Sequence, residues 1–259
     1  MIPRIIPVLL IADGGLVKTV RFGDARYVGD PINAVRIFNE KQVDELIVLD
    51  IRATIEGRSP EESAIEEIVS EAFMPVGYGG GVRDLATATR LIQLGVEKVV
   101  INAAAIERPD DVARIADRLG SSTLVVSIDA SARRDGSYEV VTHGAKTRTG
   151  IDVRAHAEAV AKLGAGEIIL NSVDRDGTME GYDLELLRTV TSIVDVPVVA
   201  CGGAGTTEDL LAAIRDGGAS AAAAGSIFVF HGRHRAVLIT YPSYEARSAL
   251  FSDDFQPAR

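Results

Sequence analysis

Short runs of apolar residues alternate along this chain with longer segments whose apolar positions recur every three or four residues. The runs are rich in Val, Ile and Ala and predict eight buried parallel strands: residues 5–11, 45–51, 75–80, 98–103, 123–130, 167–172, 197–203 and 220–226. Two of the helical segments open on an N-cap residue followed by proline, Asp30-Pro31 and Ser59-Pro60. Eight βα units in 259 residues predict an α/β fold, the (β/α)8 TIM barrel.

The two halves of the chain also resemble each other. LIVLDI matches EIILNS, which places Asp50 at an offset of 121 from Asn171. MPVGYGGGVRD matches VPVVACGGAGT, with Gly81 at an offset of 122 from Gly203, and INAAAI matches AAGSIF. Three matches in the same order predict a twofold repeat, a single barrel over residues 1–242 with half-barrels of about 1–120 and 121–242. The polar residues 243–259 lack periodicity, and we expect them to form a loose C-terminal tail.

Composition narrows the classes of function. The single cysteine, Cys201, excludes an intrachain disulfide and a cysteine-based zinc site, and the four histidines are scattered, so we expect neither a metal nor a cofactor. The net charge of −10 argues against nucleic acid and anionic membranes as partners. The chain begins without a signal peptide and no apolar run approaches a membrane span, so we expect a soluble, cytoplasmic protein.

Glycine runs close the third predicted strand of each half, at residues 79–81 and 202–205. Each run is followed by a helix start, Asp84 or Thr206, and free N–H groups at such a point can hold an anion. The commonest barrel phosphate site lies after strands seven and eight, and the repeat predicts a second one in the other half. The first site would comprise Gly203, Gly225 and Ser226, and the second Gly81, Asn102 and Ala103. Two sites indicate a long substrate with a phosphate at each end, although the glycines alone could only permit tight βα turns.

Carboxylates gather at the predicted C-terminal strand ends, where barrels place their chemistry. Asp129 ends the fifth strand, and Asp50, Asp174 and Asp176 lie at or just beyond strand ends. Each could instead cap a helix or a turn. By the repeat, Leu10 on the first strand corresponds to Asp129, at an offset of 119. A symmetric acid–base pair would need a carboxylate at both positions, and this chain has only one.

Several stretches of the sequence carry a more specific resemblance. They are RIIP, DGG…VK, GDP, DEL..LDI, GGGVR, KVVIN, VSIDA, GAGEIIL, DRDGT..GYD and CGGAG. In this order and spacing, over about residues 1–230, they resemble the HisF family, the cyclase subunit of imidazole glycerol phosphate synthase. That resemblance implies a barrel that receives ammonia at its bottom from a HisH-type glutaminase. At its top, ammonia reacts with a ribulose-linked bisphosphate.

The resemblance assigns roles to individual positions. Asp129 matches one of the family's two catalytic aspartates, and Lys18 matches a lysine that contacts the substrate. One phosphate site is matched by Gly81 and Asn102; the other is matched by Gly177, Gly203, Gly225 and Ser226. We count Asp50, Asn171 and Asp176 as further candidates for binding the substrate.

Four charged residues match the family's ammonia gate at the bottom of the barrel. They are Arg4, Glu45, Lys98 and Glu167, each at the N-terminal end of a predicted strand. Two acids and two bases can pair in a ring there, where a lone buried charge would be costly. A purely structural ring of ion pairs is the alternative, and a role in passing ammonia rests on the resemblance.

Leu10 is the departure from the family, which carries its other catalytic aspartate at this position. Losing one partner of an acid–base pair costs on the order of 10² to 10⁴ in rate. The segments YVGDPINAVRIFNEKQVDEL and AAGSIFVFHGRHRAVLITYPS resemble the HisF-like proteins of glycosyl amidation, the WbuZ type. That resemblance implies a barrel that supplies ammonia to an ATP-dependent sugar amidotransferase, which turns an acetamido group into an acetamidino group. A working histidine cyclase, with Asp13 or another group replacing the missing acid, and a non-catalytic scaffold for a glutaminase are the alternatives.

Overall fold

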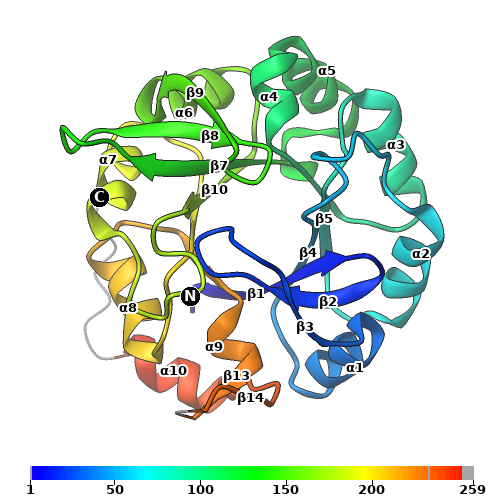
Figure 1. The fold of residues 1–259 in the computed structure, drawn as a ribbon, viewed down its shortest axis with the longest axis vertical. Coiled ribbons are helices and arrows are strands. Elements are labelled where there is room, and N and C mark those ends of the chain that lie inside the picture. The colour runs from blue at the N-terminus through cyan, green and yellow to red at the C-terminus, as the bar shows by residue number, and fades with distance from the viewer. Residues whose placement is uncertain (1, 233, 253–259) are drawn as a thin grey trace.

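The computed structural model describes residues 2–232 and 234–252, and it contains a closed barrel of eight parallel strands surrounded by helices (Figure 1). Each strand pairs with the next, and the last pairs again with the first. The strands, in order around the barrel, are β1 (Arg4–Ala12), β4 (Leu46–Asp50), β5 (Val76–Gly79), β6 (Lys98–Ile101), β7 (Leu124–Ala132), β10 (Glu167–Ser172), β11 (Val198–Cys201) and β12 (Ala221–Ala224). The predicted TIM barrel is confirmed.

The outer ring consists of helices that follow the barrel strands. They are α1 (Pro31–Glu40), α2 (Glu62–Glu71), α3 (Leu85–Gln93), α5 (Pro109–Leu119), α6 (Val153–Lys162), α7 (Leu184–Thr191), α8 (Thr207–Arg215) and α10 (Tyr244–Ser252). Three shorter turns, α4 (Ala103–Glu107), η1 (Ser121–Thr123) and α9 (Ser226–Val229), lie between them. Within the described residues, none of these helices is long and apolar enough to cross a membrane.

Side-chain caps explain several of the helix starts. The Asp30 carboxylate accepts a hydrogen bond from the Asn33 N–H at 2.8 Å, as predicted. Thr206 opens α8 with a reciprocal capping box, again at the predicted place. The prediction at Ser59-Pro60 is wrong, because α2 begins at Glu62 after an extended Glu61. Residues 58–60 instead pack on the glycine run: a Cβ on Gly81 would lie 3.3 Å from the Pro60 Cδ.

Side chains alternate between the inside and the outside of the barrel, as strand geometry requires. We call the inward-facing apolar set between the two ends of the barrel the interior column: Ile6, Val8, Ile47, Val100, Val125, Ile169, Val199, Ala221 and Ala223, with Leu10, Leu49 and Cys201 packed against it. Ile47 and Ile169 occupy equivalent places at an offset of 122. The repeat is therefore one residue out of register at Asp50, and the structural counterpart of Asn171 is Leu49.

Two antiparallel hairpins, which the apolar pattern did not predict, extend the first strand of each half-barrel. β2 (Gly15–Lys18) pairs with β1 and with β3 (Arg26–Gly29). β8 (Tyr138–Thr142) pairs with β7 and with β9 (Thr147–Asp152). The hairpins project from opposite sides of the barrel (Figure 1). Their equivalent positions in the two halves agree with the twofold repeat.

The expected loose tail is wrong for residues 244–252, which form helix α10. Phe251 is buried in the large outer core, and the Arg247 guanidinium is buried against Asp44. Two short strands, β13 (Phe230–His231) and β14 (Ala236–Val237), connect α9 to this helix. These contacts hold the segment although its apolar periodicity is weak. Residues 253–259, the rest of the expected tail, lie outside the described residues.

The packing of α10 predicts a clear difference between two phenylalanines. Phe251→Ala should lower the free energy of unfolding by about 3 kcal/mol, because it leaves a cavity in the core. Phe73→Ala removes the same side chain from a position that is 87% exposed, and should change stability by less than about 0.5 kcal/mol. Denaturant unfolding of both variants measures the difference. Equal stabilities would show that α10 does not contribute to the core.

Candidate functional site

A ring of four charged side chains closes the bottom of the barrel. The Lys98 Nζ lies 2.8 Å from the nearest carboxylate oxygen of both Glu45 and Glu167. The Arg4 guanidinium pairs with the same two carboxylates through its two terminal nitrogens. The carboxylates are almost fully buried, at 3% and 6% exposure. Each acid therefore has two cations and each cation two acids, which is the arrangement predicted for these residues.

The charges of the ring stabilise one another. Burial acts to lower the pKa of Arg4, but hydrogen bonds and charge attraction from Glu167 and Glu45 outweigh it, and the pKa is raised. Ile6, Ile47 and Ile169 follow directly above the ring in the interior column. The bottom of the barrel is thus a neutral, paired layer beneath an apolar core.

At the opposite end of the barrel, polar and apolar side chains face each other. Leu10 and Leu49 are neighbours in the β1–β4 pairing, and Asp129 and Asn171 are neighbours in the equivalent β7–β10 pairing. The repeat relates Leu10 to Asp129 and Leu49 to Asn171. One half of the barrel mouth therefore presents an apolar pair where the other half presents a carboxylate and an amide.

Two amides hold the Asp129 carboxylate. Asn102 donates from Nδ2 to Asp129 Oδ2 at 3.1 Å, and Asn171 donates to Oδ1 at 3.4 Å. Burial raises the pKa of Asp129 to about 7, since these two hydrogen bonds only partly offset the loss of solvent and the nearby Asp176 adds to the shift. A carboxyl group with such a pKa is able both to donate and to accept a proton near neutral pH.

Lys18 is buried in the same mouth, at 5% exposure. Its Nζ donates to the Val8 carbonyl at 2.8 Å and lies where a Cβ on Gly225 would be, only 2.2 Å away. Burial lowers the pKa of Lys18 to about 8, and the charge of Asp176 opposes this shift. Burial also raises the pKa of Asp176, whose carboxylate accepts a hydrogen bond from the Thr19 hydroxyl at 3.3 Å.

The predicted phosphate-binding glycines have structural reasons of their own. A Cβ on Gly203 would lie 2.2 Å from the Gly181 carbonyl, and one on Gly177 would lie 2.1 Å from the Thr19 carbonyl. The helices after the glycine runs are capped by their own residues, Asp84 and Thr206. The short helices α4 and α9, which begin after Asn102 and Gly225, have no side-chain cap. The N-terminal turns of these two short helices are closed by backbone hydrogen bonds, from the Ala105 N–H to the Asn102 carbonyl and from the Phe228 N–H to the Gly225 carbonyl. Phosphate binding beside them stays a prediction.

Asp50 and Asp13 do not reach the barrel mouth. Asp50 follows the inward-facing Leu49, and its carboxylate accepts hydrogen bonds from the Arg52 and Ala53 N–H groups at 2.9 and 3.0 Å. Together with Asp13 it lines a cavity of about 250 Å³ beside Tyr78. Asp13 is exposed and pairs with Arg52 at 3.4 Å. Asp50 thus fixes its own loop, and Asp13 does not take the place of the acid missing at Leu10.

Sequence reasoning missed Cys201 and Thr19 at this site. Cys201 packs on the interior column beside Asn171, and burial raises the pKa of its thiol to about 12. Alternation along β11 from Val199 would have placed this side chain inside. Thr19 carried no signal, because it joins the site only through the contact between the β2–β3 loop and Asp176. No group of three or more His, Cys, Asp or Glu side chains able to hold a metal occurs among the residues the structure describes.

Comparison of the sequence with known proteins assigns this chain to a family. The family described as "Histidine biosynthesis protein" matches residues 4–235. The "Putative imidazole glycerol phosphate synthase subunit HisF" of Leptospira borgpetersenii is 49% identical over 250 residues, 96% of this chain and 98% of the relative. The chain belongs to the HisF family.

Two further HisF relatives cover most of the chain. The "Putative imidazole glycerol phosphate synthase subunit hisF2" of Pseudomonas aeruginosa is 50% identical over 239 residues, 92% of this chain and 95% of the relative. The "Imidazole glycerol phosphate synthase subunit HisF" of Caulobacter vibrioides is 49% identical over 228 residues, 88% of each chain. The relatives thus include proteins named as numbered HisF paralogues as well as proteins named simply HisF.

The raised pKa of Asp129 predicts that replacing this residue by asparagine increases stability relative to wild type in a pH-dependent way. The folded protein keeps this proton up to about pH 7, whereas the unfolded chain releases it near pH 3.8, so the wild type loses stability as pH rises between these values. Asp129→Asn has no such proton, and its unfolding free energy relative to wild type should rise over this window by at most about 4 kcal/mol.

Unfolding by denaturant at several pH values measures this gain. Asp135→Asn is the control, because Asp135 is exposed and hydrogen bonds from Ser137 lower its pKa. The control should show no gain between about pH 4 and pH 7. A pH-independent difference for Asp129→Asn would contradict the raised pKa.

The ring predicts that Lys98 contributes far more to stability than the exposed Lys162. Lys98→Met leaves two buried carboxylates with one cation and should cost about 3–5 kcal/mol of unfolding free energy. Lys162→Met removes a lysine whose side chain is 77% exposed, from an (i, i+4) pair with Glu158, and should cost less than about 0.5 kcal/mol. Thermal and denaturant unfolding compare the two. Similar small losses would mean that the ring is not closed in solution.

Proposed function

We propose that this HisF-family barrel conducts ammonia within a glutamine-dependent amidotransferase and that its own cyclase activity is weak. Our preferred acceptor reaction is the conversion of a sugar's acetamido group into an acetamidino group during surface-glycan synthesis, catalysed by an ATP-dependent amidotransferase. The pairing of Leu10 with Leu49 opposite Asp129 and Asn171 carries this proposal. A mouth with one proton-handling side retains ligand contacts but lacks the second acid of the family's cyclase.

The lining of the barrel interior suits the passage of neutral ammonia. The charged ring stands at the entrance, and above it the interior column contains only small or apolar side chains up to Cys201. Two of its strands contribute unusually little volume: β12 supplies Ala221 and Ala223, and β5 turns Gly77 inward. Neutral NH3 crosses such a column more readily than a charged ion, for which desolvation is costly. Conduction through the barrel is thus chemically consistent with its lining.

The partner that feeds the ring would be a HisH-type glutaminase. Relatives of this chain are named as subunits of imidazole glycerol phosphate synthase, which supports a barrel that acts as one subunit of a complex. A glutaminase docked over Arg4, Glu45, Lys98 and Glu167 would release ammonia directly at the ring. A barrel that only activates this glutaminase remains an alternative. A glutaminase stimulated equally with and without a phosphorylated ligand would favour that alternative.

A working histidine cyclase is the second candidate function. The observation that favours it is the intact polar side of the mouth, in which Asn102 and Asn171 hold Asp129 with Lys18 buried nearby. Asp176 is the only other buried carboxylate that influences the pKa of Asp129 among the described residues. Asp176 belongs to the loop after β10 but accepts a hydrogen bond from Thr19, which directly follows the strand that pairs with β1 at Leu10. It is therefore the acid that a working cyclase would use in place of the missing aspartate.

The acceptor can be tested directly. The barrel, a HisH-type glutaminase and an N-acetyl sugar amidotransferase should together convert glutamine, ATP and an N-acetylated sugar into the amidino sugar. Omission of the barrel should abolish glutamine-driven product but leave product formation from ammonium salts. If the barrel makes no difference with glutamine as nitrogen donor, the amidation proposal fails.

Leu10 supplies the sharpest test of the lost chemistry. Leu10→Asp restores a carboxylate across from Asp129 and should raise ammonia-driven turnover of the family's bisphosphate substrate by at least about 10². Leu10→Asn introduces a side chain of nearly the same shape as aspartate but without the acid. Leu49→Asp places an acid on the neighbouring strand. Both controls should remain near the wild-type rate. Wild-type turnover equal to that of Leu10→Asp would contradict the proposal.

A further inference from the structure

The carboxylate of Asp44 joins the C-terminal helix to the barrel strands at the bottom of the molecule. Its Oδ2 accepts a hydrogen bond from the Ile5 N–H at 3.2 Å and an ion pair from the Arg247 Nη1 on α10. The Tyr241 hydroxyl lies 3.2 Å from the same oxygen and 2.9 Å from the Ile5 carbonyl, and donates to one of them at a time. One oxygen thus gathers contacts from β1 and from the segment leading into α10.

Asp44, Tyr241 and Arg247 are in mutual contact. Arg247 is 5% exposed, and its Cζ stands 5.1 Å from the centre of the Tyr241 ring. Tyr241 in turn packs on Phe228 at 5.4 Å between ring centres. The Arg247 Nε is buried and has no hydrogen-bond partner among the described residues, so the contact with Asp44 is its guanidinium's principal compensation. Loss of that contact would leave a buried cation unpaired and would displace the helix.

Both strand contacts of Asp44 adjoin the charged ring. Ile5 follows Arg4 along β1, and Asp44 precedes Glu45 in the loop just before β4. Arg4 and Glu45 are themselves an ion pair of the ring. The position of Asp44 is therefore linked to the backbone beside two ring residues at once, through the Ile5 N–H next to Arg4 and through its own peptide bond to Glu45.

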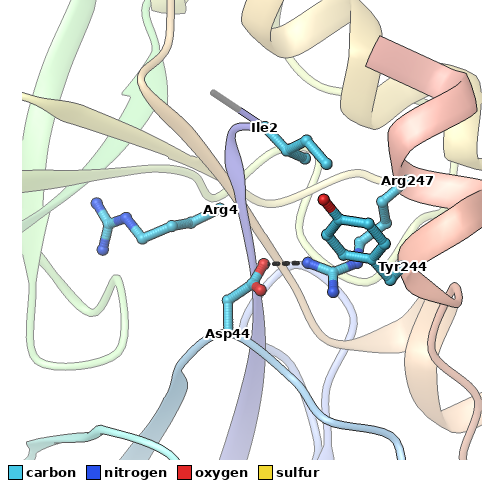
Figure 2. A pocket seen from close by; sticks show the side chains of 5 residues that line it. All are labelled: Ile2, Arg4, Asp44, Tyr244 and Arg247. Atoms are coloured by element: carbon cyan, nitrogen blue, oxygen red, sulfur yellow. Dashed lines mark hydrogen bonds and ion pairs between the residues drawn. The ribbon is translucent and has the colours of Figure 1, made fainter. Parts of the chain in front are cut away.

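An open cavity lies between the ring and the helix. It measures about 450 Å³ and is lined by Ile2, Arg4, Asp44, Tyr244 and Arg247. Figure 2 shows the Arg247 guanidinium directed at Asp44, while the head of Arg4 points away from it. A group that enters this cavity would meet a ring residue, the connecting carboxylate and the helix together.

We propose that Asp44 is a positioning residue through which α10 sets the geometry of the ion-pair ring. With Arg247 and Tyr241 in place, the N-terminal ends of β1 and β4 are held in the spacing that lets Arg4 reach Glu45. When α10 shifts, this spacing relaxes and the ring loosens. The coupling does not depend on the nitrogen acceptor, but its use to admit ammonia rests on the proposed function.

Hydrogen exchange and side-chain NMR of the full-length protein test the coupling. Arg247→Met should speed exchange of the Ile5 amide about tenfold and shift the Arg4 Nε resonance, since both depend on Asp44. Arg247→Lys keeps a cation near Asp44 and should restore much of both signals. Arg36→Met, which breaks the exposed Arg36–Glu71 pair at 3.0 Å, should leave both unchanged.

The outcomes separate this inference from other accounts. Faster exchange limited to residues 238–252, with Ile5 and Arg4 unaffected, would show that Arg247 only anchors its own helix and would overturn the proposal. If Arg247→Met does not fold, Tyr241→Phe and Arg247→Lys give the same two readouts with milder changes. A coupling observed in a barrel that binds no glutaminase would leave this inference standing and reject the proposed function.

Discussion

In a closed parallel sheet, every second side chain of each strand is enclosed by the other strands, and this constraint decides what the molecule can do. Along β1 it turns Arg4, Ile6, Val8 and Leu10 inward. Along β7 it does the same for Val125 and Asp129. An enclosed charge must be paired and an enclosed polar group must be hydrogen-bonded. The barrel meets both demands only at its two ends, with an ion-pair ring below and an amide-held carboxylate above.

The same constraint explains how far the sequence could predict the structure. Apolar runs and their spacing were enough for the barrel and the repeat, because both depend on period and order alone. The charged ring was predicted through the resemblance to the HisF family, which pointed to these four positions. Asp50 was misplaced because a one-residue slip in the repeat moves a side chain to the other face of its strand. The two hairpins and α10 escaped prediction because long-range contacts hold them. Phe251 in the outer core and Arg247 on Asp44 leave little trace in local periodicity.

The residues related by the twofold repeat differ in character between the two ends of the barrel. At the bottom, Glu45 and Glu167 are equivalent in the two halves, and both remain acidic. At the top, the equivalence of Leu10 with Asp129 and of Leu49 with Asn171 joins unlike residues. The two cations of the ring have no charged equivalents, since Arg4 corresponds to Thr123 and Lys98 to Ala221. A barrel with a charge-paired entrance and a half-apolar exit is suited to passing a small neutral molecule upward and to carrying out little acid–base chemistry at its mouth. This contrast is the physical basis of the proposed function.

Complementation of a bacterial strain that lacks its histidine cyclase tests the central claim most directly. The account predicts that the wild-type chain, expressed with a HisH-type glutaminase, does not restore growth without histidine, whereas Leu10→Asp does. Growth at a normal rate with the wild-type chain would show that a single carboxyl at this mouth suffices for the cyclase reaction, and would contradict the account.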